Sequence, residues 1–489
     1  MDTTPITSGL RGAPTVDSRP QGSDPINGQK PSEDCAVVGF KGKINAYNPI
    51  ITALRTLQHR GQESAGMAVF DGKKVTLKKG SGLVTDVFNP ATDDIKGYVG
   101  VGHTRYSTAG SKNVVNAGPF VMNSSFGYIT ISHNGEIVNA DELRDSMKKE
   151  GITFQSDSDT EVMLAELSRN ISKYGLKRGF EQSMESLRGA YACAISINDR
   201  LYAVRDPNGI RPLVIGKNND GYIVASESCA IDALEGTLIK NIEPGEVVEI
   251  SDEGIRTIVS KSANRIAHCM FEYVYFSRPD SVIDGINVYA ARVNMGRILA
   301  KESPVEADIV VPVPDSGRSQ AIGYSMESGM PYTEGLIKNR YSERTFIMPT
   351  QSDRKAAIHL KLNPIREVIG GKKVVLVDDS IVRGNTMRFI VGLMRKYGAK
   401  EIHVRIGSPH IIAPCYFGVD MKTKDQFIAR GKTDEEINRE IGADSLAFLS
   451  VDGLKQAISM KNNNLCLGCL TGEYPIDISK KLAENITSY

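Results

Sequence analysis

The stretch Val374-Val-Leu-Val-Asp378-Asp379-Ser380-Ile-Val-Arg383-Gly384-Asn385-Thr386 joins an aliphatic run to two acids and a short polar turn. The aliphatic residues 374–377 predict a buried strand of a parallel sheet. After the turn, apolar residues spaced three and four apart predict one face of a helix, and these are Met387, Ile390, Val391, Met394 and Tyr397. The amino end of a helix presents free backbone N–H groups and suits a phosphate, whereas adjacent acids suit ribose hydroxyls or magnesium.

This run resembles the phosphoribosyl-pyrophosphate (PRPP) loop of type I phosphoribosyltransferases. An ordinary strand–turn–helix with a solvated acidic pair is the alternative interpretation. The resemblance implies that Asp378 and Asp379 contact the ribose of PRPP. It also implies that the turn binds the 5-phosphate through Ser380, Arg383, Gly384, Asn385 and Thr386.

A second strand and turn, Ile309-Val-Val-Pro-Val-Pro314-Asp315-Ser316-Gly317, precedes a helical pattern through Ile322 and Met326. It resembles the pyrophosphate loop of the same transferases, in which backbone N–H groups face the diphosphate. The resemblance implies that Asp315, Ser316 and Gly317 bind PRPP and that Ser316, Asp378 and Asp379 contact Mg²⁺. The cationic segment 338–354, which begins with Lys338, resembles the flexible lid over PRPP, and a solvated basic loop is its alternative.

Composition bounds the class of protein. The chain has 489 residues, which predicts two or three domains at about 150 residues each. Its 59 Lys and Arg nearly balance 58 Asp and Glu, so we expect neither a nucleic-acid nor an anionic-membrane partner. No apolar run approaches the ~18 residues of a membrane helix. Seven cysteines are too sparse for a disulfide scaffold. These features predict a cytoplasmic enzyme.

Four blocks follow Cys35-Ala-Val-Val-Gly39-Phe in the amino-terminal half. They are His59-Arg60-Gly61-Gln62-Glu63-Ser64-Ala65-Gly66, Gly102-His103-Thr104-Arg105-Tyr106-Ser107-Thr108, Ser132-His133-Asn134-Gly135-Glu136 and Ser158-Asp159-Thr160-Glu161. In order and spacing they resemble class II glutamine amidotransferases, which are N-terminal-nucleophile (Ntn) hydrolases. The resemblance spans residues 35–265.

The resemblance implies roles for five residues of the glutaminase site. Cys35 is the nucleophile, and its own α-amino group is the general base. Arg105 binds the carboxylate of glutamine through a bidentate contact, and Asp159 accepts hydrogen bonds from its ammonium group. The side chain of Asn134 and the backbone N–H of Gly135 form the oxyanion hole.

Two features of the sequence raise an alternative to an active glutaminase. Cys35 has no free α-amine until residues 1–34 are removed, and this Pro- and Gly-containing segment is predicted to be disordered, either as a self-cleaved propeptide or as an upstream start. Ala36 stands where the family usually has glycine. A catalytically impaired, nucleotide-sensing protein or an ammonia-only transferase is therefore the alternative to an intact enzyme.

The remaining cysteines suggest a cofactor. Cys466-Leu-Gly-Cys469 is a CxxC pair that alone fits a zinc half-site, a redox pair or neither. With Cys269 and Cys415, their contexts resemble the four ligands of the iron–sulfur branch of glutamine PRPP amidotransferases. The resemblance implies a structural [4Fe–4S] cluster in preference to zinc. Cys193 and Cys229 are predicted to be buried thiols without a role.

These resemblances imply three segments and one reaction. Residues 1–34 are a leader, residues 35–265 a four-layer αββα Ntn glutaminase domain, and residues 266–489 an α/β phosphoribosyltransferase domain with a parallel sheet and a carboxyl-terminal cluster-binding segment. The implied reaction is the first committed step of purine synthesis: ammonia from glutamine passes internally to PRPP and gives 5-phosphoribosylamine and pyrophosphate. Inhibition by purine nucleotides and a homotetramer or homodimer are expected with it.

Overall fold

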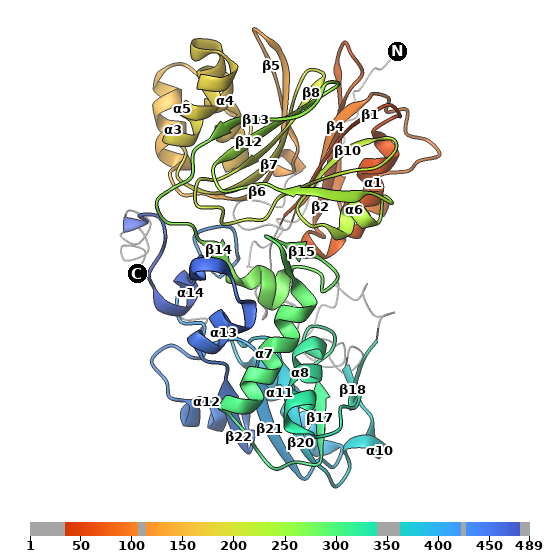
Figure 1. Cartoon of the computed structure of the whole chain (residues 1–489), viewed down its shortest axis with the longest axis vertical. Coiled ribbons are helices and arrows are strands. Elements are labelled where there is room, and N and C mark those ends of the chain that lie inside the picture. The colour runs from red at the N-terminus through yellow and green to blue at the C-terminus, as the bar shows by residue number, and fades with distance from the viewer. Residues whose placement is uncertain (1–34, 106–113, 340–361, 422–426, 480–489) are drawn as a thin grey trace, which may run out of the picture.

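The computed structural model describes residues 35–105, 114–339, 362–421 and 427–479. Two facing antiparallel sheets with helices outside them form one domain, and a parallel sheet with helices on both faces forms the other (Figure 1). The segments predicted as leader (1–34) and as most of the lid (340–361) lie outside the described residues.

The strand that begins just after Cys35 lies in the interior of the first sheet. β1 (Ala36–Gly42) pairs with β4 on one side and β10 on the other, and Ala36 lies opposite Thr104. Burial on both faces explains its uninterrupted apolar run. The sheet order is β11 (Thr237–Asn241), β9 (Val214–Lys217), β10 (Gly221–Ala225), β1, β4 (Val99–Arg105), β2 (Ser64–Phe70) and β3 (Val75–Ser81).

The second sheet carries the segment Asn134-Gly135 on β6. Its order is β13 (Gly254–Ser260), β12 (Glu246–Ser251), β8 (Arg200–Arg205), β7 (Gly189–Ile197), β6 (Gly127–Ile137) and β5 (Phe120–Ser124). Val37, Val101 and Ala194 share the apolar layer between the two sheets. The outer layers contain α1 (Tyr47–Thr56), α2 (Val84–Val87) and α6 (Cys229–Asp232) on one side, and α3 (Ala140–Lys149), α4 (Asp159–Tyr174) and α5 (Leu176–Ser186) on the other. The predicted four-layer αββα arrangement is confirmed.

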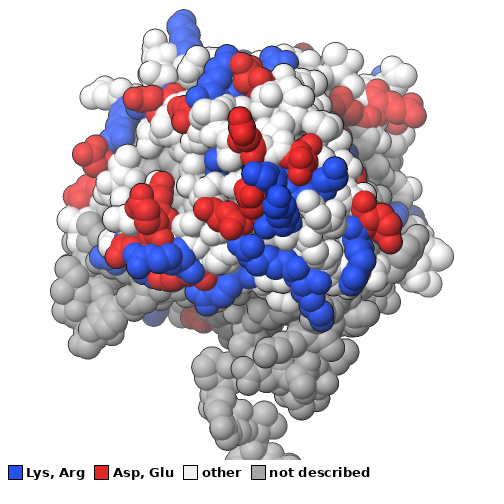
Figure 2. Space-filling model, turned by 90° about the horizontal axis from the view of Figure 1, so that it is seen from below, with Lys and Arg blue, Asp and Glu red and all other residues white. Residues whose placement is uncertain are grey.

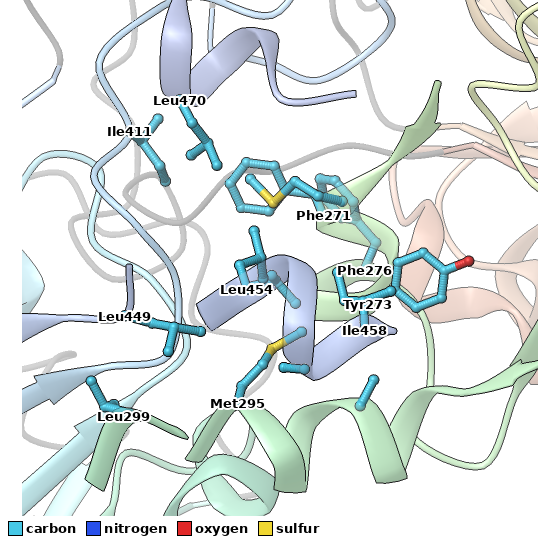
Figure 3. Close-up of a cluster of buried hydrophobic side chains, with 14 of the residues drawn as sticks. Phe271, Tyr273, Phe276, Met295, Leu299, Ile411, Leu449, Leu454, Ile458 and Leu470 are labelled. Atoms are coloured by element: carbon cyan, nitrogen blue, oxygen red, sulfur yellow. The ribbon is translucent and has the colours of Figure 1, made fainter. Parts of the chain in front are cut away.

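The parallel sheet of the second domain is built as the run 374–377 predicts. β17 (Ile309–Pro312), β20 (Lys373–Asp378), β21 (Glu401–Ile406) and β22 (Ser445–Phe448) pair in this order, all in parallel. Val375 and Val377 face a core with α7 (Val288–Glu302), α8 (Arg318–Ser328) and α13 (Val451–Ile458). Figure 3 shows part of this core, with Met295 of α7 near Leu454 and Ile458 of α13. Val374 and Leu376 face the opposite core with α11 (Asn385–Lys396) and α12 (Asp434–Ile441).

Both helices predicted after the loops are present. α11 buries Met387, Ile390, Val391 and Met394, so its predicted face is confirmed. The helix predicted through Ile322 and Met326 is present as α8, in which Met326 is 60% exposed. α8 crosses α7 through small residues, since a Cβ at Gly323 would lie 1.9 Å from the carbonyl oxygen of Val293. Such close helix contact leaves no room for a long apolar side chain at that position.

Short elements join the domains and fill their edges. β14 (His268–Cys269) pairs in parallel with β23 (Leu465–Cys466), and together with α14 (Gly468–Thr471) it brings the carboxyl-terminal segment to the junction of the two domains (Figure 1). The π-helix Glu272–Phe276 follows β14. The remaining short elements are β15 (Val282–Ile283), β16 (Ile286–Asn287), β18 (Leu336–Lys338), β19 (Leu362–Pro364), α10 (Arg366–Ile369) and the 3₁₀ turns Gln58–Arg60, Val114–Asn116 and Lys461–Asn463.

The surface at the lower end of the second domain carries both signs of charge. Lys, Arg, Asp and Glu side chains are interspersed there (Figure 2). Among the described residues, no helix is both long enough and apolar enough to cross a membrane.

Candidate active sites

The predicted nucleophile and an oxyanion donor come together from facing sheets. Cys35 immediately precedes β1, and its backbone N–H donates to Oδ1 of Asn134 at 3.4 Å. Asn134 is only 1% exposed, and its Nδ2 has no hydrogen-bond partner among the described residues. Because the amide oxygen is turned towards Cys35, the buried N–H₂ group is left to donate to another atom.

Gly135 occupies a backbone position that excludes a side chain. Its φ is +139°, and a Cβ there would lie 1.9 Å from the carbonyl oxygen of Ala190 on β7. The glycine therefore keeps β6 close to β7 next to Asn134, at a point where any other residue would push the strands apart.

The two predicted glutamine-binding residues flank this pair. Asp159 begins α4, and its Oδ2 accepts a hydrogen bond from the backbone N–H of Ile137 at 2.9 Å, two residues beyond Gly135. Arg105 ends β4, the neighbour of β1, and its Nη1 donates to the carbonyl oxygen of Asn116 at 2.9 Å. The register of β1 on β4 places the end of β4 beside Cys35.

Ala36 does not face this site. It is fully buried and belongs to the apolar cluster formed with α1, whereas its neighbour Val37 belongs to the layer between the sheets. Alternation along a strand therefore sends the methyl group of Ala36 away from Asn134.

The two predicted PRPP loops meet at one edge of the parallel sheet. β17 and β20 are neighbours, with Pro312 opposite Val377, so both loops leave the same carboxyl edge. A Cβ at Gly317 would lie 2.5 Å from the carbonyl oxygen of Val377, which explains a glycine at this close approach. Ligands of open α/β sheets bind at this edge.

The acids of the two loops differ in environment. Asp378 is 2% exposed and Asp379 is fully buried, and Oδ2 of Asp379 accepts a hydrogen bond from Ser380 at 2.6 Å. Asp315 is half exposed and lies 3.5 Å from Arg318 and 3.6 Å from Lys338. The two acids after β20 are thus buried, whereas Asp315 in the loop after β17 lies near the surface with Arg318 of α8 and Lys338 of β18.

The turn before α11 leads directly into a helix amino terminus, where an anion can bind. Gly384 has φ of +75°, and α11 starts at the next residue. Asn385 is exposed, and Arg383 and Thr386 are half-buried. Ser316 lies in the facing loop beside Gly317. The structure therefore brings all the predicted PRPP residues from two segments to one edge, with Lys338 at the end of β18.

Comparison with known proteins agrees with both domains. Residues 103–233 match the glutamine amidotransferase domain, and residues 281–408 match the phosphoribosyl transferase domain. The amidophosphoribosyltransferase of Methanocaldococcus jannaschii is 50% identical over 464 residues, covering 91% of this chain and 98% of that protein. The chain belongs to the amidophosphoribosyltransferase family.

Other members of the amidophosphoribosyltransferase family are similar to this chain in sequence and fold. The enzyme of Bacillus subtilis is 48% identical over 454 residues, covering 91% of this chain and 95% of that protein. The solved structure of glutamine PRPP amidotransferase from B. subtilis, complexed with ADP and GMP, matches with a TM-score of 0.85 and 45% identity. That match covers 91% of this chain and 98% of the B. subtilis chain. The predicted two-domain fold is confirmed.

Two residues of the glutaminase half had been given no role from the sequence. His103 is buried, and its Nε2 lies 2.9 Å from the carbonyl oxygen of His133, next to Asn134. Burial lowers the pKa of His103 to about 3, so a neutral imidazole donates this bond. Ser226 accepts a hydrogen bond from the backbone N–H of Val37 at 2.9 Å. His103 had a sequence signal in its place two residues before Arg105, and Ser226 had one in the segment Ser226-Glu227-Ser228, which resembles the glutaminase pattern.

The four cysteines predicted as ligands line one cavity in this member of the amidophosphoribosyltransferase family. Cys269 lies directly opposite Cys466 in the β14–β23 pair, and Cys415 and Cys469 complete the lining with Arg211. Burial raises the pKa of Cys466 to about 12 and that of the other three thiols as well. Among the described residues, no three His, Cys, Asp or Glu side chains are grouped closely enough to hold a single metal ion.

Cys193 and Cys229 are both buried, as predicted for thiols in apolar surroundings. Cys193 lies in β7 within the core beneath α4. Burial raises the pKa of Cys229 to about 12, so this thiol stays protonated at neutral pH.

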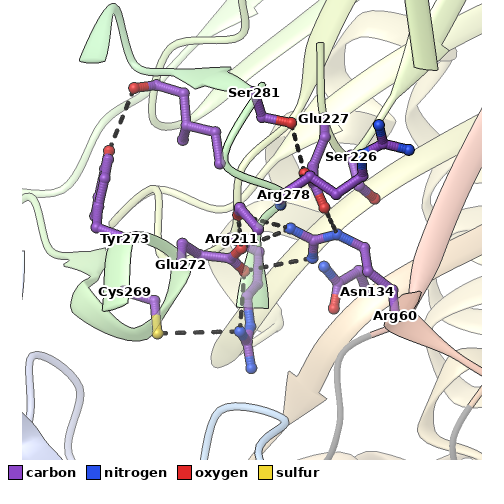
Figure 4. Close-up of polar contacts among 12 residues, drawn as sticks. Arg60, Asn134, Arg211, Ser226, Glu227, Cys269, Glu272, Tyr273, Arg278 and Ser281 are labelled. Atoms are coloured by element: carbon purple, nitrogen blue, oxygen red, sulfur yellow. Dashed lines mark hydrogen bonds and ion pairs between the residues drawn. The ribbon is translucent and has the colours of Figure 1, made fainter. Parts of the chain in front are cut away.

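A buried ionic network joins the two domains between the glutaminase site and the cysteine cavity (Figure 4). Arg60 bonds Glu227 of its own domain and lies 2.6 Å from Glu272 of the π-helix. Arg211 lies 3.2 Å from the same Glu272 and 4.0 Å from Sγ of Cys269. These charges are almost fully buried, so each depends on its partner, and removing one leaves an uncompensated charge.

Proposed function

We propose that this protein hydrolyses glutamine at Cys35 and transfers the ammonia internally to PRPP, giving glutamate, 5-phosphoribosylamine and pyrophosphate in the first committed step of purine synthesis. The observation that carries the proposal is the buried Nδ2 of Asn134, which has no hydrogen-bond partner among the described residues, on a side chain that contacts the backbone nitrogen of Cys35. An apolar protein interior does not leave an amide donor unsatisfied without cost, so a substrate atom is its natural partner.

The glutaminase half uses groups that the fold holds in place. After cleavage before Cys35, the freed α-amine takes the proton of the thiol, and the sulfur attacks the amide carbon of glutamine. Nδ2 of Asn134 and N–H of Gly135 donate to the carbonyl oxygen as it becomes negative. Ammonia leaves with the proton, and water then releases glutamate from the thioester. Arg105 and Asp159 hold the carboxylate and the ammonium group of the substrate.

The transferase half positions PRPP at the carboxyl edge of the parallel sheet. The turn before α11 binds the 5-phosphate, the Asp378–Asp379 pair the ribose, and the loop 315–317 the pyrophosphate. Ammonia forms a bond to C1 as the bond to pyrophosphate breaks. Asp378, Asp379 and Ser316 would hold Mg²⁺ together with the substrate, and the ion would neutralise charge on the departing pyrophosphate.

We also propose that the four-cysteine cavity holds a [4Fe–4S] cluster rather than zinc. Four thiols from three chain segments face one enclosed space, and a cluster of this kind takes four Cys ligands. Burial raises the pKa of Cys269, and the charge of Arg211 beside it acts in the opposite direction and favours the thiolate that a cluster needs. Such a cluster ties β14 to the carboxyl-terminal segment and has a structural role.

Three further properties belong to the proposal. Residues 1–34 are removed as a propeptide, which frees the α-amine of Cys35. Purine nucleotides inhibit the enzyme, in line with the ADP and GMP complex of the B. subtilis relative. The working form is a homotetramer or homodimer in the cytoplasm, a compartment that suits seven cysteines without disulfide bonds.

The central test measures two activities on anaerobically purified protein. We expect PRPP- and glutamine-dependent release of glutamate and pyrophosphate, and also pyrophosphate release with ammonia in place of glutamine. Intact mass shows where the chain starts. Protein that starts at Met1 and keeps only the ammonia-dependent reaction would support the ammonia-only alternative. Absence of both activities in protein that starts at Cys35 would overturn the proposal.

A separate test addresses the cofactor. We expect iron and acid-labile sulfide in equal amounts, four of each per chain, with a broad visible absorbance band. Cys466→Ser should lose that absorbance. Cys229→Ser is the matched control, because Cys229 is an equally buried thiol outside the cavity. One zinc per chain without sulfide would reject the cluster and leave the proposed reaction standing.

A further inference from the structure

The loop that carries Cys415 reaches the predicted oxyanion hole of the other domain. Gly418 has φ of +98°, and a Cβ there would lie 2.9 Å from the carbonyl carbon, 3.0 Å from Cα and 3.1 Å from the carbonyl oxygen of Gly135. Two glycines, one from each domain, thus touch backbone to backbone. The absence of a side chain at Gly418 allows this approach.

The same loop is held by groups of the cysteine cavity. Nε and Nη2 of Arg211 donate to the carbonyl oxygen of Phe417 at 3.1 and 3.0 Å. The backbone N–H of Phe417 in turn donates to Sγ of Cys415 at 3.4 Å. Phe417 is therefore fixed at both its N–H and its carbonyl group, immediately before Gly418.

An apolar cluster continues from the cavity to the strands of the glutaminase site. Cys466, Tyr416 and Phe417 pack in one group with Val138 and Ala190, which follow β6 and start β7. Ala190 is also the residue whose carbonyl oxygen lies against Gly135. The backbone around Gly135 is thus bounded on one side by β7 and on the other by the loop 415–418.

We propose that Gly418 is a positioning residue for the oxyanion hole, through which the state of the cysteine cavity sets the rate of glutamine hydrolysis. The inference rests on the proposed function of both sites. It extends that function, because the cavity then acts on the chemistry at Cys35 as well as stabilising the carboxyl-terminal segment. Neither Gly418 nor Arg211 contacts the reacting atoms.

The physical reason is the geometric demand of transition-state stabilisation. Oxyanion donors act only when they lie within about 3 Å of the position that the developing charge will occupy. Shifts of about 0.5 Å in supporting residues are enough to degrade a catalytic site. A loop packed against the Gly135 backbone controls such shifts, whereas the binding of glutamine depends on Arg105 and Asp159 elsewhere.

The test compares Gly418→Ala with Gly472→Ala. Gly472 also has positive φ (+78°) in the cavity-forming segment, but nothing lies within 4 Å of the Cβ that alanine would add. We expect Gly418→Ala to lower kcat of the glutaminase about 10-fold or more, towards the 10²–10³-fold loss of a whole donor. KM for glutamine, ammonia-dependent transfer, visible absorbance per chain and unfolding temperature should match those of Gly472→Ala.

A second variant keeps the inference testable if Gly418→Ala does not fold. Arg211→Lys keeps a cation beside Glu272 but loses the two-nitrogen hold on the Phe417 carbonyl, so the same selective loss of glutaminase kcat is expected. In the double variant Asn134→Ala/Gly418→Ala, the losses should be less than multiplicative, because both act on one donor pair.

Three outcomes would overturn the inference. In the first, both variants retain the kcat of the unmodified enzyme. In the second, the variants lower glutaminase and ammonia-dependent activities equally, which indicates a general structural effect. In the third, KM rises with kcat unchanged. Failure of the proposed function is distinct, since the unmodified chain would then lack glutamine-dependent activity.

Discussion

The two candidate sites of this molecule are built in opposite ways. The PRPP site collects two loops at the carboxyl edge of a parallel sheet, and each loop is one continuous stretch of sequence. The glutaminase site is formed between facing sheets, where Cys35 and Asn134 lie 99 residues apart in the chain and come within hydrogen-bond distance. The first kind of site is readable from local pattern, whereas the second exists only once the sheets pack.

The sites also differ in how their polar groups are satisfied. At the PRPP edge, the buried carboxylate of Asp379 already has a hydroxyl partner in Ser380. At the glutaminase site, Nδ2 of Asn134 is buried without one among the described residues. The glutaminase site therefore holds a hydrogen-bond donor in place for a substrate atom before the substrate binds. The transferase loop instead offers a turn shape and charges that suit its ligand.

The largest effect is expected from loss of the nucleophile, which should stop the glutamine reaction and spare the ammonia reaction. Cys35→Ala removes the sulfur nucleophile and should lower glutamine-dependent product formation on the order of 10⁴-fold or more. Ammonia-dependent transfer in the same variant is the internal control and should stay near the level of the unmodified enzyme. Loss of both activities in a folded variant would show that the sites are not separable.

The next largest effect is expected from loss of the buried donor Nδ2 of Asn134. Asn134→Ala should lower glutaminase kcat about 10²–10³-fold, because one oxyanion-hole donor is lost. KM for glutamine should change little, since the amide contributes to the transition state and the substrate carboxylate and ammonium are held elsewhere. A rise in KM with unchanged kcat would contradict the role assigned to Nδ2.

A smaller effect is expected at the PRPP edge, and it should not distinguish the nitrogen sources. Asp379→Asn removes a buried charge and should lower glutamine- and ammonia-dependent transfer alike, by about 10- to 100-fold, as for loss of a charged hydrogen bond. Asp452→Asn is the matched control in the same domain, since the Asp452 side chain is 93% exposed. A drop confined to the glutamine-dependent reaction would contradict the assignment.

The smallest effect concerns the buried charges between the two sites. Burial disfavours the charged form of Glu227, but Arg60 and His59 outweigh it and hold its pKa well below the usual 4.5. The folded-state pKa lies below the unfolded value, so this stabilisation is present above about pH 4.5 and is lost as the pH falls through the folded value.

Urea unfolding at pH 7 and pH 4 measures that contribution. The free energy of unfolding should fall less between these pH values in Glu227→Gln than in the unmodified chain. Glu253→Gln is the control, because Glu253 is exposed and away from the network. An identical pH dependence in Glu227→Gln would mean that the carboxylate titrates as in the unfolded chain.

Local sequence patterns predicted the elements of the transferase site, whereas the residues of the glutaminase site were predicted from a family resemblance. The aliphatic run 374–377, the acids after it and the apolar face of α11 follow from local spacing, and the structure has them as expected. The helix predicted through Ile322 and Met326 is present as α8, but its close contact with α7 at Gly323 does not follow from the spacing of apolar residues. The contact of His103 was not predicted because its partner, the His133 carbonyl, belongs to another strand.

The sequence by itself determined which chemical groups are present and where each local element begins: a strand with two acids, a helix amino terminus, a cysteine ahead of an apolar strand and a CxxC pair. It did so because side-chain type and period act over a few residues. Tertiary structure alone decided that Asn134 turns its oxygen to Cys35, that Cys269 faces Cys466 and that Gly418 touches Gly135. These contacts depend on strand register and domain packing, which join residues far apart in the chain and leave no local pattern.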